Sequence, residues 1–202
     1  TLSEEYVHYF EKQKTHEGDV YYSFDDLVKA MQKDPTGTFK LGSNINAANV
    51  KPAGKSYVTN AFKGTLTSTD GNKFTISNMN RPLFGDIVGG TVKDLLLENV
   101  NIDMSGTDRI APIANVIKNN ATVENIKVTG NVVGNNDVSG VINKIDGSGK
   151  LSNVAFIGKV HAAGNRGGYL TGIVGENWKG IVEKAYVDAE ITGNKAKAAG
   201  IV

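Results

Sequence analysis

The spacing of hydrophobic residues changes from a helical period to a strand period near residue 38. The apolar residues of segment 23–35 recur at helical spacing: Phe24, Leu27, Val28 and Met31. Ser23 stands at the N-cap position with Asp26 three residues later, and Pro35 follows where the pattern stops. These positions predict a short helix over residues 23–35.

The first residues carry a weaker form of the same pattern. Ser3 is a candidate cap for segment 2–14, and Tyr6, Val7 and Phe10 form a narrow apolar face. We therefore expect two short helices and assign residues 1–37 to an N-terminal helical cap. No apolar run approaches the roughly 18 residues of a membrane span, so we expect no membrane insertion. Any export signal or anchor would lie outside this segment.

From Thr38 onward, apolar and polar residues alternate, which is typical of strands. Beyond residue 80 the chain aligns as four successive lines, which begin at Leu83, Ile113, Val141 and Ile173. The starting points lie 28 to 32 residues apart. Each line contains several apolar segments that are too short for helices and are bounded by Gly, Asn or Asp. This regularity indicates a repeat of about three strands.

Three apolar columns stay in step through the four lines. They are Val92, Val123, Leu151 and Val182; Leu95, Ile126, Val154 and Ala185; and Leu97, Val128, Phe156 and Val187. A solenoid stacks equivalent residues about 4.8 Å apart, so each column predicts an internal ladder. Each fully buried side chain of such a ladder contributes about 1.5–3 kcal/mol.

A polar column runs beside the apolar ones: Asp94, Asn125, Asn153 and Lys184. We expect it at a corner between two strands, where side-chain amides can bond the backbone of the neighbouring coil. Lys184 has no amide and interrupts this ladder.

The columns predict an all-β fold, a parallel β-helix over residues 38–202 with about 28–32 residues per coil and short N-terminal capping helices. The letters GIV at 172–174 and 200–202 mark the same strand in successive coils, whereas GIV at 180–182 belongs to another strand. We therefore expect the sequence to stop inside a coil and to be part of a longer protein.

Composition limits the partners of the chain. The 22 Lys and Arg residues balance 21 Asp and Glu residues, so the net charge of +1 gives no electrostatic footprint for nucleic acid or an anionic membrane. No cysteine is present, so no disulfide supports the fold and the redox compartment stays open. Partners are expected to be recognised locally.

The segments GIVG (172–175), GVIN (140–143) and PLFG (82–85) resemble the glycine-flanked repeat known as the GLUG motif. With the preceding SFDDLVKAM and FKLGSNI segments, they make residues 20–202 similar to the β-helical region of the streptococcal immunoglobulin A protease family of zinc metallopeptidases. The resemblance implies a right-handed parallel β-helix within a secreted, cell-wall-associated parent. It also implies that this region holds immunoglobulin A for cleavage elsewhere, that adjacent domains are partners, and that zinc belongs to the parent's protease domain.

A catalytic or metal site is not predicted within the segment. The HExxH signature of that family has no counterpart, because His16-Glu17 is followed by Gly-Asp-Val. The three histidines, His8, His16 and His161, are not spaced as a metal-binding pair. GDIVGGTVK (85–93) lacks the end of a phosphate loop, and DGSG (146–149) lacks the short period of calcium-binding coils. We expect no enzymatic activity and no cofactor in this segment.

One carboxylate pair bears on polysaccharide cleavage. Glu124 and Glu183 share an outward column with Lys93 and Ser152, two coils or roughly 9–10 Å apart. That separation is near the upper limit for an inverting glycosidase pair. No aromatic platform lies beside both, and Lys93 next to Glu124 is explained by cross-strand charge pairing.

The stronger functional signal is aromatic. Trp178, the only tryptophan, lies in ENWKG beside Lys179, and Tyr169 and Arg166 belong to the insertion GNRGGY. Tyr186 is expected at an outward strand position. Because Trp, Tyr and Arg dominate interface hot spots, these five residues are the candidate partner-binding residues. The structural alternative is that Trp178 packs over the edge of its coil.

The preferred hypothesis is a non-catalytic β-helical domain of a secreted zinc metalloendopeptidase that helps bind or position immunoglobulin A. The first alternative is a structural or adhesive cell-surface stalk, because stacked coils extend by about 4.8 Å each. The second alternative is a polysaccharide-cleaving β-helix.

Overall fold

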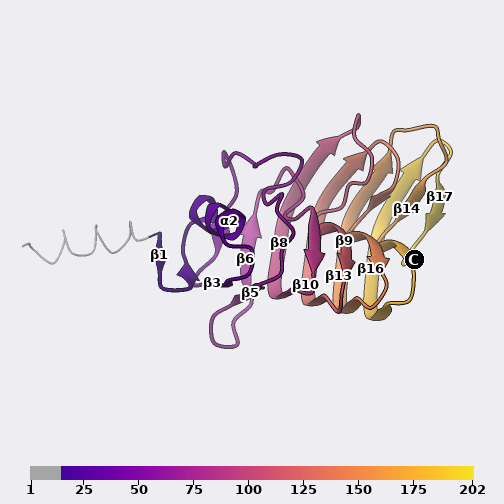
Figure 1. Cartoon of the computed structure of the whole chain (residues 1–202). Helices are drawn as coiled ribbons and strands as arrows, with labels where there is room; N and C mark the ends of the chain where they lie inside the picture. The colour runs from indigo at the N-terminus through magenta and orange to yellow at the C-terminus, as the bar shows by residue number, and fades with distance from the viewer. Residues whose placement is uncertain (1–14) are drawn as a thin grey trace, which may run out of the picture.

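The structure, a computed structural model, describes residues 15–202 and shows a parallel β-solenoid of about five turns (Figure 1). The predicted β-helix is confirmed, and one α-helix accompanies the strands in the described part of the chain. The helix expected over residues 2–14 lies outside the described residues. The division of the chain at residue 37 stays a prediction.

Helix α2 (Phe24–Lys33) lies at the N-terminal end of the stack and matches the predicted helix (Figure 1). The Ser23 hydroxyl accepts a hydrogen bond from the Asp26 N–H at 3.3 Å, as an N-cap does. All four predicted apolar positions of the helix are buried. The Phe24 ring meets the buried Tyr57 ring edge-on at 4.9 Å, which anchors the helix to the coils.

Two short strands lie between the two predicted helices, within residues 1–37: β1 (His16–Glu17) and β2 (Val20–Tyr21). Strand β2 pairs in parallel with β3 (Thr38–Leu41), so the sheet begins ahead of α2. Strands of two residues carry too few positions to show an alternating pattern, which is why the sequence did not predict them.

One large sheet runs along the whole solenoid. Its order is β1-β2-β3-β5-β8-β10-β13-β16, with β5 (Thr65–Ser68), β8 (Thr91–Met104), β10 (Thr122–Gly134), β13 (Lys150–Ala162) and β16 (Ile181–Gly193). Strand β4 (Ile45–Asn46) pairs with β6 (Phe74–Ser77), which also pairs with β8. We call this the main sheet. Its pairs are parallel except β1 with β2.

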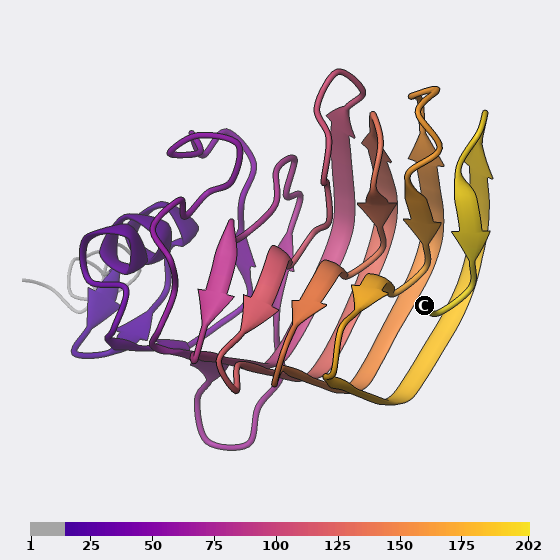
Figure 2. The ribbon, with the colours of Figure 1, turned by 45° about the vertical axis from the view of Figure 1, so that its right-hand side comes forward.

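Two smaller sheets complete the coils (Figure 2). The second sheet has β7 (Asp86–Val88), β9 (Ala114–Lys118), β12 (Ile142–Asp146) and β15 (Val174–Asn177). The third sheet has β11 (Val138–Ser139), β14 (Tyr169–Thr171) and β17 (Lys197–Ala199). From β10 onward the chain visits the main, third and second sheets in turn, in agreement with the expected three strands per coil.

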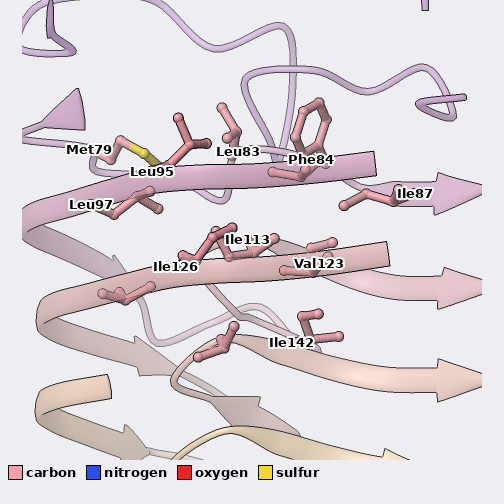
Figure 3. Close-up of a cluster of buried hydrophobic side chains, with 14 of the residues drawn as sticks. Met79, Leu83, Phe84, Ile87, Leu95, Leu97, Ile113, Val123, Ile126 and Ile142 are labelled. Carbon is pink, nitrogen blue, oxygen red and sulfur yellow. The ribbon is translucent and has the colours of Figure 1, made fainter. Parts of the chain in front are cut away.

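The predicted apolar columns form the core. Val123 pairs with Val92 on one side and with Leu151 on the other, and all three side chains are buried. Figure 3 shows Val123 and Ile126 within one cluster of buried apolar side chains that spans neighbouring coils. The other two columns also follow the predicted register. This continuous interior is the main source of stability of the solenoid.

The polar corner column forms a ladder of side chains. Asp94, Asn125, Asn153 and Lys184 all have left-handed backbone, with φ between 51° and 57°. The Asn125 amide donates to the Asp94 carboxylate at 2.6 Å, and the Asn153 amide donates to Asn125 Oδ1 at 3.1 Å. These side chains therefore bond one another and not the neighbouring backbone as expected, because the shared conformation stacks them in register. Lys184 carries no amide to continue the ladder.

The repeated GIV segments occupy the predicted positions. The Gly172 N–H donates to the Gly200 carbonyl at 2.9 Å, and the Val174 N–H donates to the Ile201 carbonyl at 2.8 Å. The two segments are therefore neighbours in successive coils. Residues 181–182 begin β16 and belong to the main sheet.

Candidate functional site

A short turn after β15 places Trp178 at the surface. Asn177 Oδ1 accepts a hydrogen bond from the Gly180 N–H at 2.8 Å, and the Asn177 amide donates to the Gly180 carbonyl at 3.1 Å. The Trp178 N–H donates to the Ile145 carbonyl of the preceding coil at 3.0 Å. The backbone around the indole is thus fixed, and 59% of the Trp178 surface stays exposed.

Two charged side chains contact the indole of Trp178. Trp178 Nε1 donates to Glu176 Oε2 at 2.6 Å, and Lys144 Nζ lies 4.9 Å from the centroid of the indole ring. These contacts restrict the rotamers of Trp178 before any partner arrives. Preorganisation of this kind lowers the entropy cost of binding.

Tyr169 lines the same hollow as Trp178. The hollow has a volume of about 480 Å³, and Glu176 and Lys197 also line it. Tyr169 is 37% exposed, its N–H donates to Asp137 Oδ1 at 2.9 Å, and Lys197 Nζ lies 5.8 Å from its ring centroid. The structure therefore brings two predicted aromatic residues into one hollow, each with a lysine beside its ring.

The other three predicted residues lie outside the lining of this hollow. The Arg166 guanidinium forms an ion pair with Asp108, in a loop of an earlier coil. Lys179 follows Trp178 in the turn and has an unusual φ of 137°. Tyr186 lies on β16, the last strand of the main sheet, where it pairs with Ala155 and is 59% exposed. The role of all five residues in binding stays a prediction.

Sequence reasoning did not single out Lys144, Glu176 or Lys197. Lys144 is the register partner of Glu176 in the second sheet, and Tyr169 is the register partner of Lys197 in the third. The coil-by-coil alignment that revealed the core columns could have revealed these pairs. Charged residues in outward columns usually mark a solvated face, so they gave no separate signal.

The predicted carboxylate column is present in the main sheet, where Glu124 and Glu183 flank Ser152 in register. Glu183 accepts from Lys150 at 2.9 Å and from the Ser152 hydroxyl at 3.2 Å. The hydrogen bond from Lys150 is the main cause that lowers the pKa of Glu183. A glycosidase acid needs a raised pKa, so this environment does not favour Glu183 as a proton donor.

The potential metal ligands of residues 15–202 are dispersed. No three His, Cys, Asp or Glu side chains gather there in an arrangement able to hold a metal ion. His16 Nδ1 lies 3.3 Å from the Asp26 carboxylate, and His161 Nδ1 lies 2.7 Å from the Thr192 hydroxyl. A donor set suited to the zinc of the resembled family is thus not found among these residues. In this part of the chain no helix has the length and apolar character needed to cross a membrane.

The protein is a β-solenoid that exposes two aromatic side chains, Tyr169 and Trp178, in one surface hollow. Solenoids offer extended lateral surfaces for binding. The chain belongs to the family of M26 IgA1-specific metallo-endopeptidase N-terminal regions, whose model matches residues 1–130. The resemblance seen in the sequence is confirmed.

Two relatives from Streptococcus pneumoniae serotype 4 show the extent of the similarity. The chain is 47% identical over 201 residues to the zinc metalloprotease ZmpB, covering 100% of the chain and 10% of that protein. It is 32% identical over 198 residues to an immunoglobulin A1 protease, covering 94% of the chain and 10% of that protein. The chain therefore spans about a tenth of the length of these curated relatives.

Solved structures agree with the fold. An IgA1 protease structure superposes with a TM-score of 0.71 at 26% identity, covering 88% of this chain and 15% of that one. A putative immunoglobulin A1 protease from Bacteroides ovatus gives a TM-score of 0.71 at 19% identity, covering 90% of this chain and 60% of that one. The second likeness concerns the fold alone.

Proposed function

We propose that this chain is a non-catalytic, substrate-positioning region of a secreted, cell-wall-associated zinc metalloendopeptidase that cleaves immunoglobulin A. Membership of the family and similarity to a zinc metalloprotease and to immunoglobulin A1 proteases support this proposal. Zinc and bond cleavage are assigned to other parts of the parent protein, which are also neighbours of this region. The role of the coils is to present a surface to the substrate.

The hollow between Tyr169 and Trp178 is the observation that carries the proposal. Its two aromatic rings are exposed. Glu176 accepts a hydrogen bond from the Trp178 indole, and Lys144 and Lys197 lie beside the rings of Trp178 and Tyr169. Aromatic side chains that are already ordered lose little entropy when a partner covers them. They also bury large areas, which is why they dominate the energetics of interfaces.

The test is binding of the chain to immunoglobulin A, measured by surface plasmon resonance. Trp178→Ala is expected to weaken binding by about tenfold or more, as removal of a hot spot does. Tyr22→Ala is the matched control, because Tyr22 is 42% exposed at the N-terminal end of the solenoid. Tyr169→Ala, Arg166→Ala, Lys179→Ala and Tyr186→Ala then sort the remaining candidates. Undetectable binding, or equal binding by wild type and Trp178→Ala, would contradict direct recognition through this hollow.

A spacer role is the second candidate, and the uninterrupted apolar core favours it. The ladder through Val92, Val123 and Leu151 makes the coils a continuous rod able to hold other domains apart. The Tyr169→Ala/Trp178→Ala double variant of the parent protease separates the two roles. Unchanged cleavage of immunoglobulin A by this variant would favour the spacer, whereas a raised KM would favour substrate positioning.

A further inference from the structure

Another surface hollow lies at the N-terminal end of the solenoid, beside α2 (Figure 2). One of its walls is the face of α2 from Asp25 to Lys33, and the other is the loop 51–53. Its volume of about 410 Å³ lies within the range of ligand-binding sites. We call it the α2 hollow. The hollow of Tyr169 and Trp178 belongs to the opposite end of the solenoid, beside β14 and β17 (Figure 1).

Apolar groups line the inside of the α2 hollow. Val28 and Tyr57 are 3% and 1% exposed, and Pro52 and Ala53 complete the apolar lining. Covering such a surface is favourable when the covering group is itself apolar. The lining therefore favours an aliphatic or aromatic side chain as the group that enters the hollow.

Hydrogen bonds fix the two walls of the α2 hollow. Gln32 Oε1 accepts from the Thr59 N–H at 2.8 Å, and Gln32 Nε2 donates to Thr59 Oγ1 at 2.8 Å. The Tyr57 hydroxyl donates to Asn80 Oδ1 at 3.0 Å. Helix and loop thus keep their separation before a partner arrives, which lowers the entropy cost of binding.

Lysines without an ion-pair partner stand at the rim of the α2 hollow. Lys29 pairs with Asp25 at 2.7 Å. Lys33 and Lys51 are exposed, and neither forms an ion pair with a described acidic residue. Residues 35–69 contain four lysines and no acidic residue, although the net charge of the whole chain is only +1. The hollow therefore combines an apolar lining with a positive rim.

We propose that the α2 hollow binds an acidic peptide segment of another protein, with an aliphatic or aromatic side chain inserted between carboxylates. The inserted side chain covers Val28 and Tyr57, and the flanking carboxylates face Lys33 and Lys51. A polyphosphate or an acidic polysaccharide would satisfy the lysines but brings no aliphatic or aromatic side chain to the lining. The proposal does not depend on recognition of immunoglobulin A through Trp178, and either one can fail alone.

Fluorescence anisotropy with the 202-residue chain tests this proposal. The probe is the labelled peptide GEDEFLEDEG. The peptide GEDESSEDEG has the same charge without the apolar pair, and a ten-nucleotide thymidine oligomer represents the polyanions. The probe is expected to bind at least about tenfold more tightly than either comparison, and to bind more weakly as salt screens its carboxylates. No binding of the probe, or equal binding of either comparison, overturns the proposal.

Charge reversals at the rim locate the binding. Lys33→Glu and Lys51→Glu are each expected to weaken binding of the probe about three- to tenfold, because an attraction becomes a repulsion. Lys127→Glu is the matched control, since Lys127 is exposed on β10 of the main sheet and the net charge changes equally. Wild-type affinity in both rim variants, or an equal loss in the control, overturns the proposal.

Ala53→Glu tests the apolar lining directly. Ala53 is exposed, so the variant is expected to keep the melting temperature of the wild type. Its carboxylate would repel the probe and occupy the hollow, so binding is expected to weaken by about tenfold or more. Wild-type affinity in this variant would show that the apolar lining is not covered, which contradicts the proposal.

Deletion of residues 1–14 tests the remaining occupant, because this segment contains Glu4, Glu5 and Glu11. The probe is expected to bind the 202-residue chain and the shortened chain with similar affinity. If the probe bound only after the deletion, the first residues of the chain would be the occupant of the α2 hollow. The proposed binding of another protein would then be wrong.

Discussion

The guanidinium of Arg166 pairs with the carboxylate of Asp108, a residue 58 positions earlier in the chain. Asp108 also accepts hydrogen bonds from the Asn135 amide at 2.9 Å and from the Asn136 N–H at 3.1 Å. One carboxylate therefore joins loops from three successive coils. The loop that carries Arg166 is held in place from two coils away.

Removing this carboxylate is expected to release the Arg166 loop without unfolding the solenoid. In Asp108→Ala, the amide protons of residues 163–168 are expected to exchange faster with solvent, because their tether to the earlier coils is lost. Hydrogen exchange read by mass spectrometry measures this change. Asp103→Ala, an exposed carboxylate on β8, is the control. Equal exchange in wild type and Asp108→Ala would show that the pair does not order the loop.

Acid is expected to weaken the same tether. Burial alone would raise the pKa of Asp108, but hydrogen bonds from Asn136 and Asn135 and the charge of Arg166 outweigh burial and lower it. A lowered pKa in the folded state contributes stability above the unfolded pKa of about 3.9, and this is lost as pH falls through the folded value. Urea unfolding of the wild type and of Asp108→Asn over a pH series measures this contribution to the free energy of unfolding. The difference in free energy of unfolding should shrink below about pH 4, and a constant difference would contradict this assignment.

Two substitutions of Asn125 distinguish the cost of backbone strain at this corner from the cost of lost hydrogen bonds. Asn125→Ala loses the bonds to Asp94 and Asn153 and forces alanine into left-handed backbone, with an expected cost of about 2 kcal/mol. Asn125→Gly loses the same bonds but accepts the backbone readily. The glycine variant is therefore expected to be the more stable of the two in urea unfolding. The reverse order would mean that φ at this corner carries no strain.

Extending the ladder is expected to stabilise the protein. Lys184 has the same left-handed backbone as Asn153, its neighbour in the column, and asparagine tolerates this conformation better than lysine. Lys184→Asn places an amide within reach of Asn153 Oδ1. We expect a gain of about 0.5–1 kcal/mol, measured by urea unfolding. Lys179→Asn is the comparison: Lys179 also has a positive φ, but its value of 137° lies outside the left-handed region that asparagine tolerates, so no gain is expected.

Close approach of two coils makes Gly158 irreplaceable. An added Cβ would lie 1.8 Å from the Gly130 carbonyl oxygen of the neighbouring strand, and φ is 148°. Gly158→Ala is expected to cost about 3 kcal/mol or more, because backbone must move. Gly71→Ala is the matched control, since Gly71 has φ of 72° with open space around it and an expected cost of about 1 kcal/mol. Thermal melting followed by circular dichroism compares them, and equal losses would contradict the clash.

The sequence predicted the repeating parts of the molecule because every coil carries the same pattern. Val123 and Leu151 align by their spacing alone, and the structure confirms their register. The pairing of Arg166 with Asp108 could not be predicted, since it depends on how two irregular loops fold across an intervening coil. The hydrogen bond between Asn125 and Asp94 was missed for a similar reason, because side-chain direction at a corner follows from backbone φ.

The loops that leave the long strands of the main sheet, 105–109, 135–137 and 163–168, differ in length yet gather along one edge (Figure 2). Insertions and deletions there leave the register of the apolar ladders unchanged, because each loop rejoins its coil at the same position. Related chains can therefore differ in the length and sequence of these loops while they keep the same apolar core. Differences in recognition between such chains are expected to lie in the lengths of these loops.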